Sequence, residues 1–228
     1  MNNKNNTLRF AAKILIIATA MIALSSAAYA YNDKLVYQLR VDGNVPKGAV
    51  VFIGDSITEG LCVAAVADKA VNFGIAGDTT TGVLARIPMY KSLPRAKAII
   101  LAIGVNDLWR GQRTDEQILS NLRLVLMQLP HKVPVVFSAI LPIDEQLEKD
   151  RYGGNSHIET LNEQTVKLCA QFKNCHYFSS YGKLLGPNGQ LVAEYHVGDG
   201  LHISPKGYDI WIADMQKALE ELKNESSE

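Results

Sequence analysis

Short runs of apolar residues recur from residue 49 into the last quarter of the chain. Five of these runs are rich in β-branched residues and are bounded by turn signals, a pattern that predicts β-strands. The strands are expected at Ala49–Gly54, Ala70–Ile75, Lys97–Gly104, Val133–Ile140 and His176–Ser180. The third and fourth runs are almost wholly apolar, which is typical of parallel strands covered by helices on both faces.

Helix signals fill the segments between these strands and the segment after the last one. Helical spacing of apolar residues predicts helices over about Thr58–Asp68, Thr79–Tyr90, Thr114–Leu129, Ser156–Phe172 and Pro205–Leu222. In the third helix, Thr114 is the expected N-cap, Gln117 completes a capping box and Pro130 ends the helix. Five apolar residues of that helix should face the sheet: Ile118, Leu122, Val125, Leu126 and Leu129. Ser204 is the expected cap of the last helix, with Pro205 in its first turn.

The alternation of strands and helices predicts the fold class. It favours a parallel five-stranded sheet with right-handed crossovers inside a three-layer α/β/α sandwich. No internal repeat or low-complexity linker divides the pattern, so we expect one domain. Two long segments, Leu141–Asn155 and Tyr181–Leu201, interrupt it. These segments are either plain surface loops or loops that select the substrate. We favour the second interpretation, because the first segment follows a strand end.

The first 30 residues have the features of a secretory signal peptide. Lys4, Arg9 and Lys13 precede an uncharged run, and Ala28-Tyr29-Ala30 forms an A-x-A cleavage site. The run is shorter than the roughly 20 residues of a membrane span. We therefore expect a signal peptide at residues 1–30, a single mature domain at 31–228 and export to the periplasm or the extracellular space. An uncleaved anchor is the alternative.

Charge and composition limit the kinds of partner that the protein is expected to bind. The chain is 47% hydrophobic and 20% charged, as is ordinary for a globular protein. Without the three basic residues of the signal, 20 basic residues face 23 acidic ones, a net charge of −3. The sequence has no stripe of basic residues that would suggest binding to nucleic acid. A small neutral substrate fits this charge better than a polyanion does.

The three cysteines do not have the spacing of a zinc site. Cys169 and Cys175 lie between a predicted helix end and a predicted strand start, so they are either a disulfide, which export permits, or two small buried residues. Cys62 is expected to pack in the core.

The first predicted strand leads directly into Gly54-Asp55-Ser56. In an open α/β sheet the carboxyl ends of the strands form the ligand crevice, so Ser56 is a candidate nucleophile. Ser56 and Glu59 also spell a capping box, S-x-x-E, and the serine could merely cap a helix. Asp55 is expected to brace the loop through backbone amides.

A serine nucleophile needs a base and an orienting acid. His131, His157 and His176 have simple structural explanations, whereas His202 lies in a loop just before the last helix. Asp199, three residues earlier, can turn back and accept the imidazole Nδ1–H, which fixes the tautomer and stabilises the imidazolium.

An ester carbonyl under attack becomes an oxyanion, which needs donors already in place. The Ser56 backbone N–H lies at a helix start and is available. Gly77 follows the second strand, where its backbone N–H can approach a substrate, and Asn106 follows the third strand with a side-chain amide. The simpler interpretation is that Gly77 and Asn106 are only turn or capping residues.

These four groups of residues together resemble the GDSL, or SGNH, hydrolase family. The blocks are Gly54-Asp55-Ser56, Gly77, Gly104-Val105-Asn106-Asp107 and Asp199-Gly200-Leu201-His202, in the family's order. The resemblance implies a flavodoxin-like sheet, with Ser56 as nucleophile, His202 as base and Asp199 as its partner. It also implies an oxyanion hole made of Ser56, Gly77 and Asn106, with no metal or cofactor.

The resemblance predicts a serine esterase of the ester-hydrolase class, and the signal-peptide features predict that it is exported. The Asn72–Thr80 segment, NFGIAGDTT, is similar to the branch that includes platelet-activating-factor acetylhydrolase catalytic subunits, which favours short, acetyl-type acyl groups. Lysophospholipase, thioesterase or acyltransferase activity is also compatible with the family, and the substrate could be a small-molecule, lipid or glycan ester.

Two interpretations lie outside this family. One is a metallohydrolase built on His196, Asp199 and His202, joined by Asp55 or Asp107. The second is a non-catalytic protein that binds carbohydrate or lipid on the same fold, since a fold does not guarantee an activity. The sequence leaves the oligomeric state open.

Overall fold

The computed structural model describes residues 29–109, 112–149 and 151–225. Most of the predicted signal peptide, residues 1–28, lies outside these ranges, and its cleavage stays a prediction. The chain divides into two compact units, and the boundary in the sequence lies between Arg40 and Val41. Of the first unit, residues 29–40 are described and are helical. Among the described residues, no helix has both the length and the apolar character that a membrane span requires.

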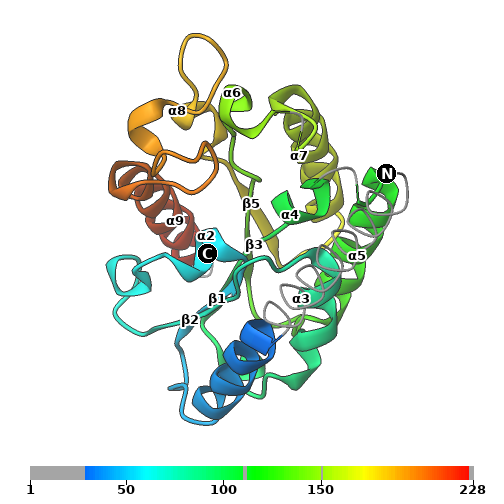
Figure 1. The fold of residues 1–228 in the computed structure, drawn as a ribbon. Coiled ribbons are helices and arrows are strands. Elements are labelled where there is room, and N and C mark those ends of the chain that lie inside the picture. Colours follow the sequence, from blue (N-terminus) through cyan, green and yellow to red (C-terminus); the bar gives the residue numbers. More distant parts are fainter. Residues whose placement is uncertain (1–28, 110–111, 150, 226–228) are drawn as a thin grey trace, which may run out of the picture. The chain divides into compact units, whose positions relative to one another are not determined.

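The second unit is built on a five-stranded sheet in which every strand pair is parallel (Figure 1). Its strands are β1 (Val50–Gly54), β2 (Ala70–Gly74), β3 (Ala98–Ala102), β4 (Val135–Ser138) and β5 (Cys175–Phe178). The strand order is β2-β1-β3-β4-β5, which is the flavodoxin-like order. The predicted α/β fold and all five strands are confirmed, and each strand ends close to its predicted bounds.

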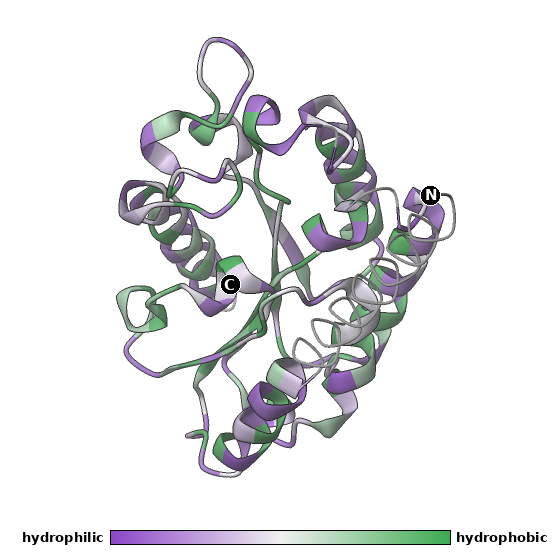
Figure 2. Ribbon diagram, in the orientation of Figure 1, coloured by the Kyte–Doolittle hydropathy of each residue, from purple (hydrophilic) through white to green (hydrophobic). Residues whose placement is uncertain are grey.

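Four longer helices cover the sheet: α3 (Thr80–Arg86), α5 (Asp115–Gln128), α7 (Asn155–Cys169) and α9 (Pro205–Glu225). In Figure 1, α3, α5 and α7 lie on one side of the sheet and α9 lies on the other, which gives the predicted three layers. The strands are hydrophobic over most of their length, while the helices combine hydrophobic and hydrophilic residues (Figure 2). Four-residue helices occur at strand ends and in loops: α2 (Ser56–Glu59), α4 (Val105–Leu108), α6 (Glu145–Glu148) and α8 (Tyr181–Leu184).

Helix α5 follows the sequence prediction closely. The Thr114 side chain accepts from the Gln117 N–H, and the Gln117 side chain accepts from the Thr114 N–H, so the capping box is complete. The apolar residues predicted to face the sheet are buried: Ile118, Leu122, Val125, Leu126 and Leu129. At the start of α9, Ser204 Oγ accepts from the Gly207 N–H, as its predicted capping role requires.

The helix predicted over Thr58–Asp68 is wrong in extent. Helix α2 ends at Glu59, and only a 3-10 turn at Val63–Ala65 follows. Other parts of the chain take the carbonyls that a longer helix would use: the Tyr208 hydroxyl donates to Ile57 O, and Asn72 Nδ2 donates to Thr58 O. Tertiary hydrogen bonds therefore override the local helical pattern.

The structure settles whether Cys169 and Cys175 form a disulfide, and it shows that the prediction for Cys62 is wrong. Cys169 at the end of α7 and Cys175 at the start of β5 form a disulfide, with Cα atoms 5.4 Å apart. Cys62 is a free and exposed cysteine, contrary to the predicted core position. The reason is the early end of α2, because Cys62 lies in the turn that follows and not on a helix face.

Candidate active site

The carboxyl ends of three strands meet at one edge of the sheet. Gly54 at the end of β1 pairs with Gly74 of β2 on one side and with Ala102 of β3 on the other. The residues that follow these strands therefore begin at the same level. This register brings Ser56, the Ile75–Asp78 turn and the α4 segment to one edge.

Glycine is required at two of these strand ends. A Cβ added to Gly54 would lie 2.1 Å from Thr58 Oγ1 and 2.3 Å from Ala102 O. A Cβ added to Gly74 would lie 2.3 Å from Glu59 N. Both contacts are far closer than real Cβ contacts, so the two glycines allow α2 to fold back directly onto the strand ends.

Helix α2 presents Ser56 in its first turn. The N-cap is Asp55, whose Oδ1 accepts from Ile57 N at 3.0 Å, so Asp55 braces the loop as expected. The capping-box interpretation of Ser56 is wrong, because Ser56 is the first helical residue and the Glu59 carboxylate accepts from Ala76 N. Burial raises the pKa of Asp55 to about 7.

A chain of hydrogen bonds joins Ser56, His202 and Asp199. His202 Nε2 lies 2.9 Å from Ser56 Oγ, and His202 Nδ1 lies 2.6 Å from Asp199 Oδ2. Asp199 Oδ1 also accepts from Leu201 N and from His202 N, which fixes the carboxylate on its own loop. With Nδ1–H held by Asp199, His202 Nε2 is free to accept the Ser56 hydroxyl proton.

The environment of Asp199 favours its charged form. Partial burial opposes ionisation, but the N–H groups of Leu201 and His202 and the His202 ring all hydrogen bond to the carboxylate, and together they hold the pKa of Asp199 below its usual value. A carboxylate that stays ionised can stabilise the imidazolium formed when His202 takes a proton.

The loop that carries Asp199 and His202 is pinned from within. Val197 N donates to His202 O at 2.9 Å, and His196 pairs with Ile203 in an antiparallel bridge. His196 Nδ1 accepts from Gly198 N and Gly200 N, at 3.0 and 3.1 Å. His196 is thus used inside the loop, and sequence reasoning missed this role because it considered only a metal-binding one.

The arrangement gives the metallohydrolase interpretation no support. Asp199 and His202 bind each other, while His196 Nε2 lies 3.8 Å from Asp144 Oδ2. Asp107 is buried and accepts from both Thr80 N and Thr80 Oγ1. In the described parts of the chain, no three His, Cys, Asp or Glu side chains are grouped so as to hold a metal ion.

Gly77 and Asn106, the two candidate oxyanion donors, follow β2 and β3 at this edge. Asp78 N donates to Ile75 O, and Gly77 has a φ of 73°, so residues 75–78 form a tight turn with glycine in the left-handed region. No heavy atom outside residues 76–78 lies within 4 Å of the place where a Gly77 Cβ would be. Asn106 Nδ2 donates to Asp78 O at 2.9 Å, which orients the amide and leaves its second hydrogen for another acceptor.

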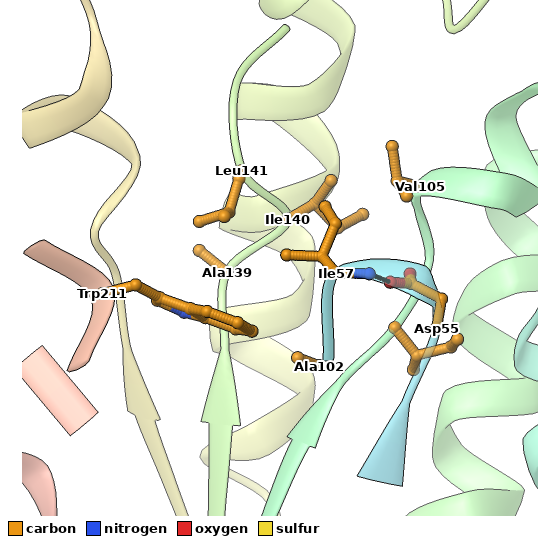
Figure 3. Close-up of a pocket in the computed structure, with 9 residues that line it drawn as sticks. Asp55, Ile57, Ala102, Val105, Ala139, Ile140, Leu141 and Trp211 are labelled. Carbon is orange, nitrogen blue, oxygen red and sulfur yellow. Dashed lines mark hydrogen bonds between the residues drawn. The ribbon is translucent and has the colours of Figure 1, made fainter. Parts of the chain in front are cut away.

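A small apolar cavity lies beside α2 and below the loop after β4 (Figure 3). Ile57 of α2 faces Trp211 of α9 across it. Trp211 is fixed by a hydrogen bond from its Nε1 to Ser138 Oγ at 3.0 Å. The remaining lining residues are Asp55, Ala102, Ile103, Val105, Ala139, Ile140 and Leu141. With a volume of about 20 Å³, the cavity has room for little more than one water-sized group.

The two long loops contact each other next to the Asp199–His202 segment. Asp144 N donates to Gly200 O at 2.8 Å, and Leu191 N donates to Ile143 O at 3.0 Å. Asn155 lies at the base of this contact, where its side chain both accepts from Ile143 N and donates to Ile143 O. These loops are therefore ordered by hydrogen bonds, and one of them leads directly into the histidine partner of Ser56.

A comparison with known proteins assigns the chain to a family. The model of the GDSL-like lipase/acylhydrolase family matches residues 52–210, which span the segments from β1 to α9. A comparison with curated proteins gives no match.

Solved structures with the same fold come from several bacteria. A Streptococcus pneumonia protein described as a platelet activating factor has a TM-score of 0.78 and 24% identity, over 90% of this chain and 98% of its own. A GDSL-like lipase from Bacteroides thetaiotaomicron has a TM-score of 0.69 and 21% identity, over 82% and 98%. An acetyl xylan esterase from Geobacillus stearothermophilus has a TM-score of 0.56 and 19% identity, over 75% and 95%. These likenesses concern the fold. The family match, which covers more than half of the chain, shows that this protein belongs to the GDSL-like lipase/acylhydrolase family and is an ester-hydrolysing serine hydrolase.

Proposed function

We propose that this protein hydrolyses carboxylic esters through a covalent acyl-enzyme on Ser56, with His202 as general base and Asp199 as its orienting acid. The observation that carries the proposal is the continuous hydrogen-bonded chain from Asp199 Oδ2 through the His202 ring to Ser56 Oγ. A chain of this kind activates a serine hydroxyl that is otherwise a weak nucleophile.

The reaction runs in two halves. His202 Nε2 takes the Ser56 proton while Oγ forms a bond to the ester carbonyl carbon. The tetrahedral intermediate then breaks its bond to the alkoxide, which leaves as the alcohol with the proton held by His202. In the second half a water molecule loses a proton to His202 and attacks the acyl-enzyme. Collapse of that intermediate returns the proton to Ser56 Oγ and releases the carboxylic acid.

The oxyanion of both intermediates needs donors. We assign this role to the backbone N–H groups of Ser56 and Gly77 and to Asn106 Nδ2. The Gly77 turn and the hydrogen bond from Asn106 to Asp78 O support the assignment, because they orient these groups before a substrate arrives.

We propose a short acyl group, of acetyl type. The resemblance of the NFGIAGDTT segment to the acetylhydrolase branch supports this. The name of one structural neighbour, an acetyl xylan esterase, agrees with a glycan acetyl ester as one substrate to test.

Export is a separate part of the proposal. It rests on the positive, apolar and A-x-A features of Met1–Ala30, and the Cys169–Cys175 disulfide is consistent with an oxidising compartment. Amino-terminal sequencing of the protein recovered from its host tests it: a first residue of Tyr31 is expected, and a retained Met1 would contradict cleavage.

Hydrolysis of p-nitrophenyl esters tests the function. Ser56→Ala is expected to remove acetate release while leaving the circular dichroism spectrum unchanged, and exposed Ser120→Ala in α5 is the matched control. Turnover retained by Ser56→Ala would refute the mechanism. A series of acyl lengths separates the possible substrates, because a maximum at long chains would favour a lysophospholipase over an acetylesterase, and consumption of an added alcohol would favour acyl transfer.

A further inference from the structure

Arg86, the last residue of α3, is fully buried. Its exposed fraction is 0%, in a helix face that also buries Val83. An arginine is almost never fully buried unless every part of its guanidinium is paired. In the sequence this position falls within an apolar helical pattern, and an arginine there is a signal that could have indicated a special role.

The guanidinium donates to four acceptors from four parts of the chain. Arg86 Nε binds Asp78 Oδ2 at 2.8 Å, and Nη1 binds Phe73 O at 2.8 Å and the Tyr90 hydroxyl at 2.9 Å. Arg86 Nη2 binds Gly54 O at 3.1 Å. Burial by itself would lower the pKa of Arg86, but the interactions with Asp78 and Tyr90 together outweigh it and the pKa is raised, so the group is charged.

Two of these acceptors belong to the segments that carry the proposed oxyanion donors. Gly54 directly precedes the Asp55-Ser56 start of α2, and Asp78 directly follows Gly77. The third donor is reached through one more bond, because Asp78 O accepts from Asn106 Nδ2 at 2.9 Å. One buried guanidinium thus links the strand end before Ser56, the glycine turn and the asparagine.

We propose that Arg86 is a positioning residue that fixes the relative placement of the Ser56 N–H, the Gly77 N–H and Asn106 Nδ2. The inference rests on the proposed function of these three groups. A preorganised oxyanion site needs donors that do not move when charge develops, and fork-shaped Arg86 joins their segments with directional bonds. Because the oxyanion exists only in the transition state and the intermediates, loss of this placement lowers kcat and leaves substrate binding largely unchanged.

Arg86→Lys tests the proposal. A lysine ammonium can replace one donor toward Asp78, but it cannot also span Phe73 O and Gly54 O. We expect kcat on p-nitrophenyl acetate to fall by about tenfold to a hundredfold, as for a donor misplaced by up to about 1 Å, with KM changed by less than about twofold.

Tyr90→Phe is the matched control. It removes one partner of Arg86 Nη1 and leaves the bonds to Asp78, Phe73 and Gly54 in place. The ring of residue 90 keeps its stacking on Phe73, whose centroid is 4.6 Å away. We expect kcat within about twofold of the wild type, whatever the change in melting temperature.

Asp78→Asn covers the case in which the lysine variant does not fold. The Asp78 carboxylate accepts from Thr79 N and from Arg86 Nε, and an asparagine can accept from only one of them while its amide faces the other donor. The same loss of kcat at constant KM is expected.

Hydrogen exchange provides a readout that does not depend on turnover. In Arg86→Lys or Asp78→Asn, peptides that cover residues 54–60 and 75–80 should exchange faster than in the wild type, while a peptide from β4 should not. A folded variant with wild-type kcat and wild-type exchange in both peptides would overturn the positioning role and leave the Ser56 mechanism intact. A wild-type protein without esterase activity would instead refute the proposed function, and unchanged exchange in the variants would then also refute the positioning role.

Discussion

Replacement of Asp55 by asparagine is expected to remove a pH-dependent loss of stability. Asp55 is 4% exposed and caps α2 through a hydrogen bond from Ile57 N to its Oδ1. An asparagine Oδ1 can accept the same bond, and asparagine is as good an N-cap as aspartate. Asp55→Asn therefore changes the charge at this position with little change in hydrogen bonding.

The magnitude follows from the pKa of Asp55. Burial is the largest cause that raises it from 3.8 to about 7, and the negative charges of Asp78 and Asp107 add to the effect. Between these two values the folded protein keeps a proton that the unfolded chain has lost, so the stability that Asp55 contributes is highest at low pH and falls as the pH rises. A shift of about three pKa units corresponds to about 4 kcal/mol, lost between about pH 4 and pH 7.

Urea unfolding of the wild type and Asp55→Asn across a pH series measures this difference. The variant should gain on the wild type by about 4 kcal/mol between about pH 4 and pH 7, and the gap should level off above about pH 8. Asp68→Asn, which removes an exposed carboxylate, is the control and should show a small gap throughout. A gap between wild type and Asp55→Asn that stays constant with pH would show that Asp55 is ionised in the fold over the whole range.

Two further predictions concern catalysis and the disulfide. His202→Ala should lower kcat by more than about a thousandfold. The loss of kcat in Asp199→Asn should be smaller than this by a factor of about ten to a hundred, because the imidazole is still present but wrongly oriented. An Asp199→Asn rate equal to the wild type would remove Asp199 from the mechanism. Replacing both Cys169 and Cys175 by serine should lower the free energy of unfolding by about 2 kcal/mol, as expected for a short closed loop, while Cys62→Ser, at an exposed position, should change it by less than about 0.5 kcal/mol. Equal effects of the double variant and Cys62→Ser in urea unfolding would contradict this.

The sheet and the residues of the candidate site were predictable because each depends on local signals. Apolar runs mark the strands whatever their partners, and parallel strands place their carboxyl ends at one edge. Once the strand after residue 49 is assigned, Ser56 lies at that edge and the Asp199–His202 spacing lies before the last helix. The three-residue spacing from Asp199 to His202 is itself local, and the structure joins the two side chains at 2.6 Å.

The features that the sequence did not predict depend on distant contacts. The early end of α2 is set by hydrogen bonds from Tyr208 and Asn72, and nothing near residue 60 reports the Tyr208 contact. The exposed position of Cys62 follows from the same bonds. The role of Arg86 was missed for a similar reason, since its acceptors Gly54 and Asp78 lie 32 and 8 residues away in the sequence.

The central claim is that Ser56 carries the acyl group during turnover, and mass spectrometry of the acid-quenched protein tests it most directly. The protein is mixed with p-nitrophenyl acetate, quenched during steady-state turnover and digested, and the modified peptide is sequenced. We predict one acetyl group on Ser56, whose Oγ lies 2.9 Å from His202 Nε2, and no acetyl group in Ser56→Ala. Continued hydrolysis with the acetyl group on another residue, or with no acetylated peptide in either protein, would contradict the mechanism.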